Sequence, residues 1–271
     1  MIIKTNLIYS NKHKLRCDLY RSESLRPAPV VVLVPGGGWK EADKNLRAPA
    51  AIALAQAGFA ALAIEYRTAP QNVFPAPIED ILEVLSFISN NSERLGFQKN
   101  NLAIMGISAG GQLAALAGMT KAVQFPELKA VVTYHAPMDL EAYSSYDSEN
   151  LNDPRWAQKL VSEFLGDEYI LKARLASPLH QVNKDAVPLL AIASKEDGSV
   201  PWEQSERTVH ALENCNVKSE FLLHPGSEHS DVCPEDVLDF GWEKLWEPEI
   251  PRRLLFHSEV IQFLRKYLMS S

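Results

Sequence analysis

A serine flanked by glycines is the residue of this sequence best suited to covalent chemistry. Residues 106–110 read Gly-Ile-Ser-Ala-Gly around Ser108; they follow an apolar run at 102–107 and precede a helical run. A serine held in a strained strand-to-helix turn needs glycine two positions before and after it, because larger side chains would clash there. The motif therefore predicts a nucleophile for acyl groups. A glycine-rich turn that only packs helix on strand is the alternative.

A second glycine-rich segment is suited to stabilising a developing negative charge. The apolar run 30–34 leads through Pro35 into three glycines, 36–38, which are followed by Trp39. Successive glycines let backbone N–H groups turn into a cavity, where preorganised donors stabilise an oxyanion. A phosphate cradle is the alternative, but it lacks the Gly-Lys-Ser/Thr that such loops carry.

An acid is expected downstream of the serine, because a strand–serine–helix turn of this kind is followed along the chain by Asp or Glu and then by His. Asp197 lies just past the strand-like run 188–194, and the following Gly198 favours a loop. Glu196 is its neighbour and the rival carboxylate. We expect Asp197 to be the acid.

The histidine is expected after the last strand. His229 lies in the loop after the run 217–223, whereas His224 still belongs to the strand edge. A histidine takes the serine proton at neutral pH and returns it to the leaving group, while the carboxylate fixes its tautomer. We therefore predict His229 as the base. His135 ends the run 130–134 and is a candidate to line the substrate pocket, although a structural histidine is the simpler interpretation.

The elements that must position these residues are strands joined by helical crossovers. Short runs rich in β-branched residues alternate with amphipathic segments, which predicts an α/β fold with a mostly parallel sheet. Residues 1–9 and 15–20 flank a polar turn and predict an antiparallel hairpin at one edge. Six further strands, which bring the total to about eight, are expected at 29–34, 59–65, 102–107, 130–134, 188–194 and 217–223. Helices are expected at 46–57, 77–91, 108–117, 203–212 and 255–268.

Two stretches exceed what a minimal sheet needs. Residues 141–185 and 230–251 both follow expected strand ends, where an α/β fold carries its ligands. We expect a single domain over residues 1–271, with the first stretch as a lid and the second as a pocket rim. Surface decoration is the alternative.

Composition restricts the partners. The 271 residues are 46% hydrophobic and 23% charged, with a formal net charge of -7. An acidic chain lacks the basic face that nucleic acids and anionic membranes require, so we expect a small-molecule partner. Neither a signal peptide nor a long apolar run is visible, and the three cysteines form no close pair, so reduced thiols and a cytoplasmic location are expected. A monomer and a homo-oligomer are both compatible with the sequence.

Together these motifs carry a family resemblance. The chain resembles the α/β-hydrolase esterases allied to hormone-sensitive lipase, and more closely their bacterial carbohydrate acetyl esterase branch. The resemblance extends over residues 30–268. Besides the two glycine motifs, it includes residues 65–70 (Glu-Tyr-Arg-Thr-Ala-Pro) and 74–80 (Phe-Pro-Ala-Pro-Ile-Glu-Asp).

The resemblance assigns roles to individual residues. It implies that Ser108, Asp197 and His229 form the catalytic triad. It also implies that the oxyanion-hole donors are the backbone N–H groups of Gly37, Gly38 and Ala109. The chain departs from the family in three places. Pro35 stands where a histidine usually braces the glycine loop, Ser230 stands where glycine is common, and the helical N-terminal cap is missing.

The resulting hypothesis is a serine esterase that works through an acyl-enzyme and needs neither a metal nor an organic cofactor. A short acyl group, such as acetyl, is expected because the sequence supplies no long apolar cap. The resemblance suggests a carbohydrate as the alcohol, with Trp39 among the tryptophans available to stack on sugar rings or, alternatively, to fill the core. Amide hydrolysis, as in formamidases or small exopeptidases, and a non-catalytic binding role stay open as alternatives.

Overall fold

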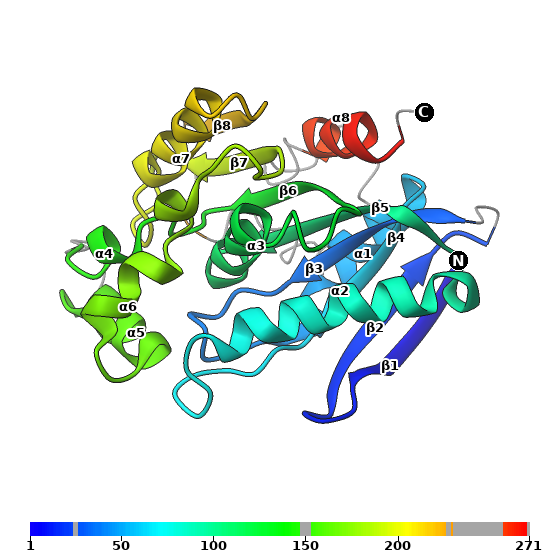
Figure 1. The fold of residues 1–271 in the computed structure, drawn as a ribbon, viewed down its shortest axis with the longest axis horizontal. Coiled ribbons are helices and arrows are strands. Elements are labelled where there is room, and N and C mark those ends of the chain that lie inside the picture. Colours follow the sequence, from blue (N-terminus) through cyan, green and yellow to red (C-terminus); the bar gives the residue numbers. More distant parts are fainter. Residues whose placement is uncertain (24–26, 147–152, 226–228, 230–256, 270–271) are drawn as a thin grey trace.

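The apolar runs of the sequence form one eight-stranded sheet in the computed structural model of the protein (Figure 1). The structure describes residues 1–23, 27–146, 153–225, 229 and 257–269. The strands are β1 (Ile2–Ser10), β2 (Leu15–Arg21), β3 (Ala28–Val34), β4 (Ala60–Ile64), β5 (Phe97–Ile107), β6 (Leu128–Tyr134), β7 (Leu189–Ser194) and β8 (Glu220–His224). Their order is β1-β2-β4-β3-β5-β6-β7-β8. The pairs β1–β2 and β2–β4 are antiparallel, and all other pairs are parallel.

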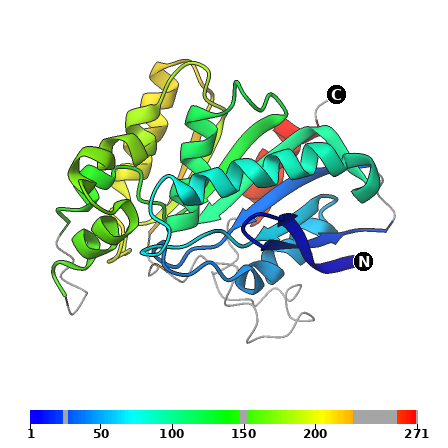
Figure 2. The ribbon, with the colours of Figure 1, turned by 60° about the horizontal axis from the view of Figure 1, so that its bottom comes forward.

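Helices cover both faces of this sheet. On one face lie α2 (Ala76–Leu95), α3 (Ala109–Thr120) and α7 (Glu203–Asn214), and on the other lie α1 (Ala48–Gln56) and α8 (His257–Leu268). Figure 2 shows α2 in front of the sheet and α8, in red, behind it. The central strands are therefore buried on both sides, which explains why they read as continuous apolar runs rather than as alternating ones. In β3, Val30 and Val32 face one core, and Val31 and Leu33 face the other.

A helical segment is inserted in the chain between β6 and β7. It contains α4 (Leu140–Tyr143), α5 (Trp156–Leu165), α6 (Tyr169–Ala176) and the 3₁₀ helix η2 (Pro178–Gln181). The helices α4, α5 and α6 pack on one another and lie together at one end of the molecule in both views (Figures 1 and 2). This segment corresponds to the stretch 141–185 that was expected to be a lid.

Most expected elements are confirmed, including the edge hairpin, and the differences are at their ends. Helix α2 runs past the expected end at residue 91, because Ser92 and Leu95 are buried and Gly96 closes the helix with a left-handed conformation. Strand β5 begins at Phe97, earlier than expected, and residues 44–47 form a 3₁₀ turn, η1 (Lys44–Arg47), before α1.

The expected pocket rim, residues 230–251, lies outside the described residues. Within the described ranges, no helix is both long enough and apolar enough to cross a membrane.

Candidate active site

Ser108 lies in a sharp turn between β5 and α3. Its backbone has φ 51° and ψ −123°, which is a strained conformation for a residue with a side chain. A Cβ added at Gly106 would lie 2.2 Å from the carbonyl oxygen of Gly110, and one at Gly110 would lie 2.3 Å from that of Pro35. Both glycines are therefore needed for the close approach of three backbone segments, as the sequence predicted, and the turn lifts Ser108 to the carboxyl edge of the sheet.

His229 joins Ser108 to Asp197 through two hydrogen bonds. His229 Nε2 lies 3.0 Å from Ser108 Oγ, and His229 Nδ1 lies 2.8 Å from Asp197 Oδ2. Asp197 follows β7, and its Oδ1 accepts hydrogen bonds from the backbone N–H groups of Ser199 and Val200, at 2.8 and 3.0 Å. The structure thus brings together the three residues that the sequence predicted for the nucleophile, base and acid.

The Asp197 side chain is fully buried, yet it stays ionised. Burial alone would raise its pKa, but hydrogen bonds from His135 and His229 outweigh burial and hold the pKa of this carboxyl well below its usual range. An ionised carboxylate can only accept hydrogen bonds. Asp197 therefore requires a hydrogen on Nδ1 of His229, which leaves the Nε2 lone pair of a neutral ring directed at the serine hydroxyl.

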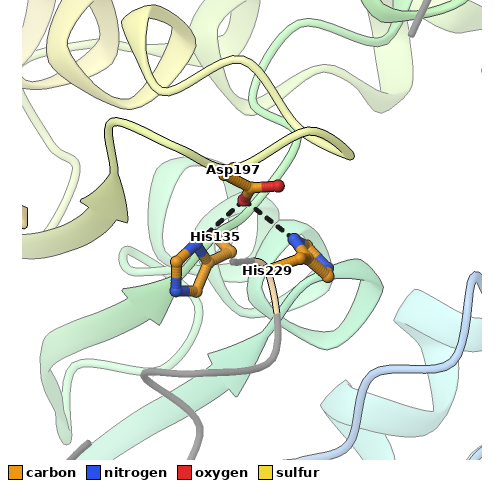
Figure 3. Close-up of side chains that lie close together, drawn as sticks. All are labelled: His135, Asp197 and His229. Carbon is orange, nitrogen blue, oxygen red and sulfur yellow. Dashed lines mark hydrogen bonds and ion pairs between the residues drawn. The ribbon is translucent and has the colours of Figure 1, made fainter. Parts of the chain in front are cut away.

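His135 does not line the substrate pocket, its candidate role, and is instead a buried histidine bonded to Asp197. Its side chain is fully buried, it is absent from the cavity wall, and its Nδ1 lies 2.9 Å from the same Oδ2 of Asp197 that bonds His229 (Figure 3). His135 ends β6 and Asp197 follows β7, and these strands are parallel neighbours. Their adjacent carboxyl ends are the signal from which this contact could have been expected.

The glycine loop lies beside Ser108. Gly37 and Gly38 have φ values of 117° and 58°, conformations that glycine adopts readily. The carbonyl of Gly37 accepts hydrogen bonds from the N–H groups of Lys40 and Glu41, at 3.0 and 3.1 Å, so the loop is tightly turned. Gly37, Gly38 and Ala109 all line one cavity together with Ser108.

Tyr66 braces this loop in a chain that has Pro35 in place of the usual histidine. The Tyr66 hydroxyl lies 3.2 Å from the carbonyl oxygen of Pro35 and 3.3 Å from that of Glu41, the two ends of the glycine turn. Burial raises the pKa of this hydroxyl, so it stays a donor. Tyr66 belongs to the segment 65–70 that carries the family resemblance, but its contact with the loop was not predicted.

Trp39 lines the same cavity as Ser108 and anchors the glycine loop. Its side chain is only 1% exposed, and its ring stacks on Phe164 of α5 with centroids 4.6 Å apart. Its indole N–H donates to Gln112 Oε1 at 2.9 Å, and the amide of Gln112 donates to the carbonyl of Ala176 at 2.6 Å. One face of the Trp39 ring is therefore covered by Phe164 and unavailable to stack on a sugar.

The site opens into a cavity of about 530 Å³, a volume typical of small-molecule sites. Tyr143 of α4 and Trp156 and Leu160 of α5 contribute to its wall, together with Ser108 and His229. A Cβ at Gly38 would lie 3.1 Å from Leu160, so α5 packs directly against the glycine loop. The segment between β6 and β7 therefore contributes one wall of the cavity.

Two groups of side chains in the described part of the chain have the spacing of metal ligands. The first is His135, Asp197 and His229, whose facing atoms are already joined by hydrogen bonds. The second contains Asp139 and His180 together with Glu141. Asp139 caps α4 by accepting from the N–H of Ala142 and pairs with His180 at 3.3 Å. Both arrangements are accounted for without an ion.

Relatives of the chain are esterases. Esterase LipC of Mycobacterium tuberculosis is 29% identical over 240 residues, which cover 83% of this chain and 59% of that protein. Isoprenylcysteine alpha-carbonyl methylesterase ICME of Arabidopsis thaliana is 27% identical over 264 residues, covering 90% of this chain and 60% of that protein. The chain thus spans about three fifths of the length of these curated relatives.

The fold is shared with solved esterase structures. A truncated form of a carbohydrate esterase from gut microbiota superposes with a TM-score of 0.77 at 21% identity, covering 98% of this chain and 97% of that chain. The eight-stranded sheet, its flanking helices and this likeness confirm the expected α/β-hydrolase fold. Residues 17–212, most of the chain, match the BD-FAE family. The protein belongs to the BD-FAE family and has an α/β-hydrolase fold.

Proposed function

We propose that the protein is a serine carboxylic-ester hydrolase that cleaves short-chain acyl esters, acetyl esters in particular. The observation that carries the proposal is the continuous hydrogen-bonded chain from Asp197 through His229 to Ser108, at the wall of a cavity that also holds the glycine loop. The names of the relatives LipC and ICME, which both describe ester hydrolysis, support it.

The first half of the reaction transfers the acyl group to the enzyme. Ser108 Oγ attacks the ester carbonyl carbon as its proton passes to His229 Nε2, 3.0 Å away. Asp197 stabilises the resulting imidazolium through the Nδ1–H hydrogen bond. His229 then gives the proton to the departing alcohol oxygen, and the carbon–oxygen bond of the ester breaks. In the second half, water activated by His229 attacks the acyl-enzyme, and Ser108 leaves with the proton.

The negative charge on the carbonyl oxygen needs donors that are in place before the reaction. Gly37, Gly38 and Ala109 supply backbone N–H groups in this proposal, and all three residues line the cavity beside Ser108. Ala109 also begins α3, so the positive end of the helix dipole adds to the stabilisation. Such fixed dipoles cost no reorganisation when the charge develops.

The cavity wall favours a small acyl group. Leu160 packs against Gly38, and Trp39, whose ring is stacked on Phe164, also lines the cavity. Large side chains therefore fill the space next to the proposed oxyanion hole. The described part of the stretch 141–185 acts as the cap of a single domain in this proposal, since Tyr143 and Trp156 line the cavity from that segment. This cap is short, and it limits the room for a long acyl chain.

A sugar is the proposed alcohol, with Trp156 as its stacking platform. Trp156 is half-buried and lines the cavity, in an edge-to-face contact with Tyr143. Trp39 also lines the cavity, but it is only 1% exposed and its ring is stacked on Phe164. Trp202 stacks on Phe221 and is not among the residues that line the cavity. Aromatic rings in such positions bind the apolar faces of sugars. A sugar acetate therefore presents its acyl group to Ser108 and its ring to Trp156.

Hydrolysis of a p-nitrophenyl ester series from acetate to octanoate, together with acetylated sugars, methyl esters and anilides, tests the proposal. We expect the highest kcat/KM for acetate, turnover of the sugar acetates, and loss of activity in Ser108→Ala. Ser86→Ala is the matched control, because its hydroxyl only bonds the carbonyl of Leu82 within α2. A preference for anilides would replace the esterase by an amidase, and absence of all hydrolysis would favour a binding role.

A further inference from the structure

Two histidines compete for one oxygen of Asp197. His135 Nδ1 and His229 Nδ1 lie 2.9 and 2.8 Å from the same Oδ2, while Oδ1 accepts two backbone N–H groups (Figure 3). Only His229 also reaches Ser108. The proposed mechanism uses one histidine, so His135 is a buried titratable group that it leaves unexplained.

His135 is a neutral donor to this carboxylate. Burial lowers its pKa and outweighs the opposing hydrogen bond to Asp197, so the ring stays uncharged. Because the ionised Asp197 can only accept, the one hydrogen of the neutral ring is on Nδ1. The remaining Nε2 is buried, has no hydrogen-bond partner among the described residues, and points away from Asp197 and His229 (Figure 3). A bare acceptor there is consistent with an uncharged ring.

The backbone holds His135 rigidly in a strained conformation. Its φ is 48°, which costs an ordinary residue about 1 kcal/mol or more. Its N–H donates to the carbonyl of Ile192 in β7 at 2.8 Å, and its ring meets that of His229 edge-on, with centroids 5.3 Å apart. The hydrogen bond to β7 offsets this strain and fixes the direction of the His135 ring toward Asp197.

Resting on the proposed function, we propose that His135 is a positioning residue that fixes the Asp197 carboxylate through a second imidazole N–H bond, so that Oδ2 is aimed at His229. With three other donors on the carboxylate, its rotation is blocked and one direction is left for His229. The second N–H also shares the negative charge of Oδ2 and so weakens its attraction for the proton that His229 gains, an electrostatic loss that we expect to be smaller than the gain from positioning.

A matched pair of variants separates this role from simple packing. His135→Asn keeps an N–H donor near the Nδ1 position and tolerates a positive φ. His135→Leu has the same branched arrangement of side-chain heavy atoms as Asn and no donor. His210→Leu on the exposed face of α7 is the control for a histidine change elsewhere. Activity is referred to the concentration of folded sites, measured by circular dichroism and thermal melting.

We expect His135→Leu to lower kcat for p-nitrophenyl acetate about tenfold with KM unchanged within about a factor of two, and His135→Asn to recover most of kcat. The acid limb of the pH profile of His135→Leu shifts to higher pH, because Oδ2 then offers its full charge to His229. The other titratable groups facing this cluster are His224 of β8 and Tyr143 of α4, which both variants retain. The proposal would be overturned if His135→Leu had the kcat of the wild type, if His135→Asn and His135→Leu lost kcat equally, or if only KM rose.

A second measurement keeps the proposal testable if His135→Leu does not fold. Nuclear magnetic resonance of isotope-labelled histidine in the wild-type protein reports which ring nitrogens carry hydrogen. We expect His135 to carry its hydrogen on Nδ1 alone in the range from the ordinary histidine pKa of about 6.5 up to about pH 8, because burial lowers its own pKa. A His135 ring that gains charge in this range, or that carries its hydrogen on Nε2, would refute the assignment.

Failure of this inference is distinguishable from failure of the proposed function. Labelling of Ser108 by a fluorophosphonate reports activation of the nucleophile without any ester substrate. If wild-type protein is labelled but hydrolyses no ester, the proposed function fails. The labelling rates of His135→Leu and His135→Asn then still test the positioning role, with the same order expected.

Discussion

Replacing Asp197 by Asn probes the tautomer on which the proposed chemistry depends. The introduced amide can still accept the backbone N–H groups of Ser199 and Val200 through its carbonyl oxygen. Its nitrogen then faces the Nδ1 atoms of His135 and His229, 2.9 and 2.8 Å from the position of Oδ2 in the wild type. Two donors would meet at each contact. The His229 ring can relieve this only by moving its hydrogen to Nε2.

The moved hydrogen removes the base. His229 Nε2 lies 3.0 Å from Ser108 Oγ, and once protonated in a neutral ring it donates to that oxygen instead of accepting its proton. Loss of the correct tautomer in a triad of this type lowers kcat by roughly three to four powers of ten, about 4 to 5 kcal/mol of transition-state stabilisation. We expect a loss of this size in kcat for p-nitrophenyl acetate, with KM little changed.

Steady-state kinetics and thermal melting of Asp197→Asn test this reasoning, with the exposed Asp185→Asn as matched control. The substitution removes a buried charge and keeps the size of the side chain, so we expect Tm to move by only a few degrees. A variant that melts normally and keeps kcat within about tenfold of the wild type would refute the assignment of Asp197 as the acid.

Three further predictions concern the loop, the turn and acid stability. Tyr66→Phe removes the hydroxyl that contacts the carbonyl oxygens of Pro35 and Glu41. We expect a loss of about 1 kcal/mol in the free energy of unfolding and a several-fold lower kcat. An unchanged kcat would show that the glycine loop does not depend on this contact. Gly110→Ala places a carbon 2.3 Å from the carbonyl of Pro35, so we expect destabilisation by about 3 kcal/mol or more, and a stable, active variant would contradict the turn geometry. The folded-state pKa of Asp197 is lowered, so its ionisation stabilises the fold above the unfolded pKa of about 3.9 and that contribution is lost as pH falls below it. The free energy of unfolding, measured in urea, should therefore fall more steeply for the wild type than for Asp197→Asn as pH decreases from about 5 to 3. Parallel plots of this free energy against pH for the two proteins would refute the prediction.

Local patterns were sufficient to predict the strands and the nucleophile. Central strands such as β3 are buried on both faces and read as unbroken apolar runs, and the steric need for Gly106 and Gly110 involves residues within one turn of Ser108. Asp197 and His229 follow consecutive strands at one sheet edge, so the topology alone brings them near Ser108. These inferences need no knowledge of side-chain packing.

Contacts between distant segments could not be predicted in the same way. The adjacent carboxyl ends of β6 and β7 indicate that His135 and Asp197, 62 positions apart, lie near each other. Nothing local distinguishes a histidine that bonds this carboxylate from one that lines the pocket. The brace from Tyr66 to Pro35 joins the segments that follow β4 and β3, and the stacking of Trp39 on Phe164 depends on how α5 packs. These roles depend on tertiary geometry.

Helix ends were also set by packing. The helix expected over residues 77–91 runs further as α2, because Ser92 and Leu95 pack into the core and extend it to Leu95, with Gly96 as its cap. Burial of one face thus outweighs the weak helix preference of the asparagines and serines in this stretch.

The most direct test of the proposed mechanism is to map the covalent adduct of a fluorophosphonate by peptide mass spectrometry in the wild type and in Ser108→Ala. We predict one adduct per chain, on Ser108, a rate of labelling that falls in Asp197→Asn, and no adduct in Ser108→Ala. An adduct on another residue, or ester hydrolysis that survives in Ser108→Ala, would contradict the assignment of Ser108 as the nucleophile.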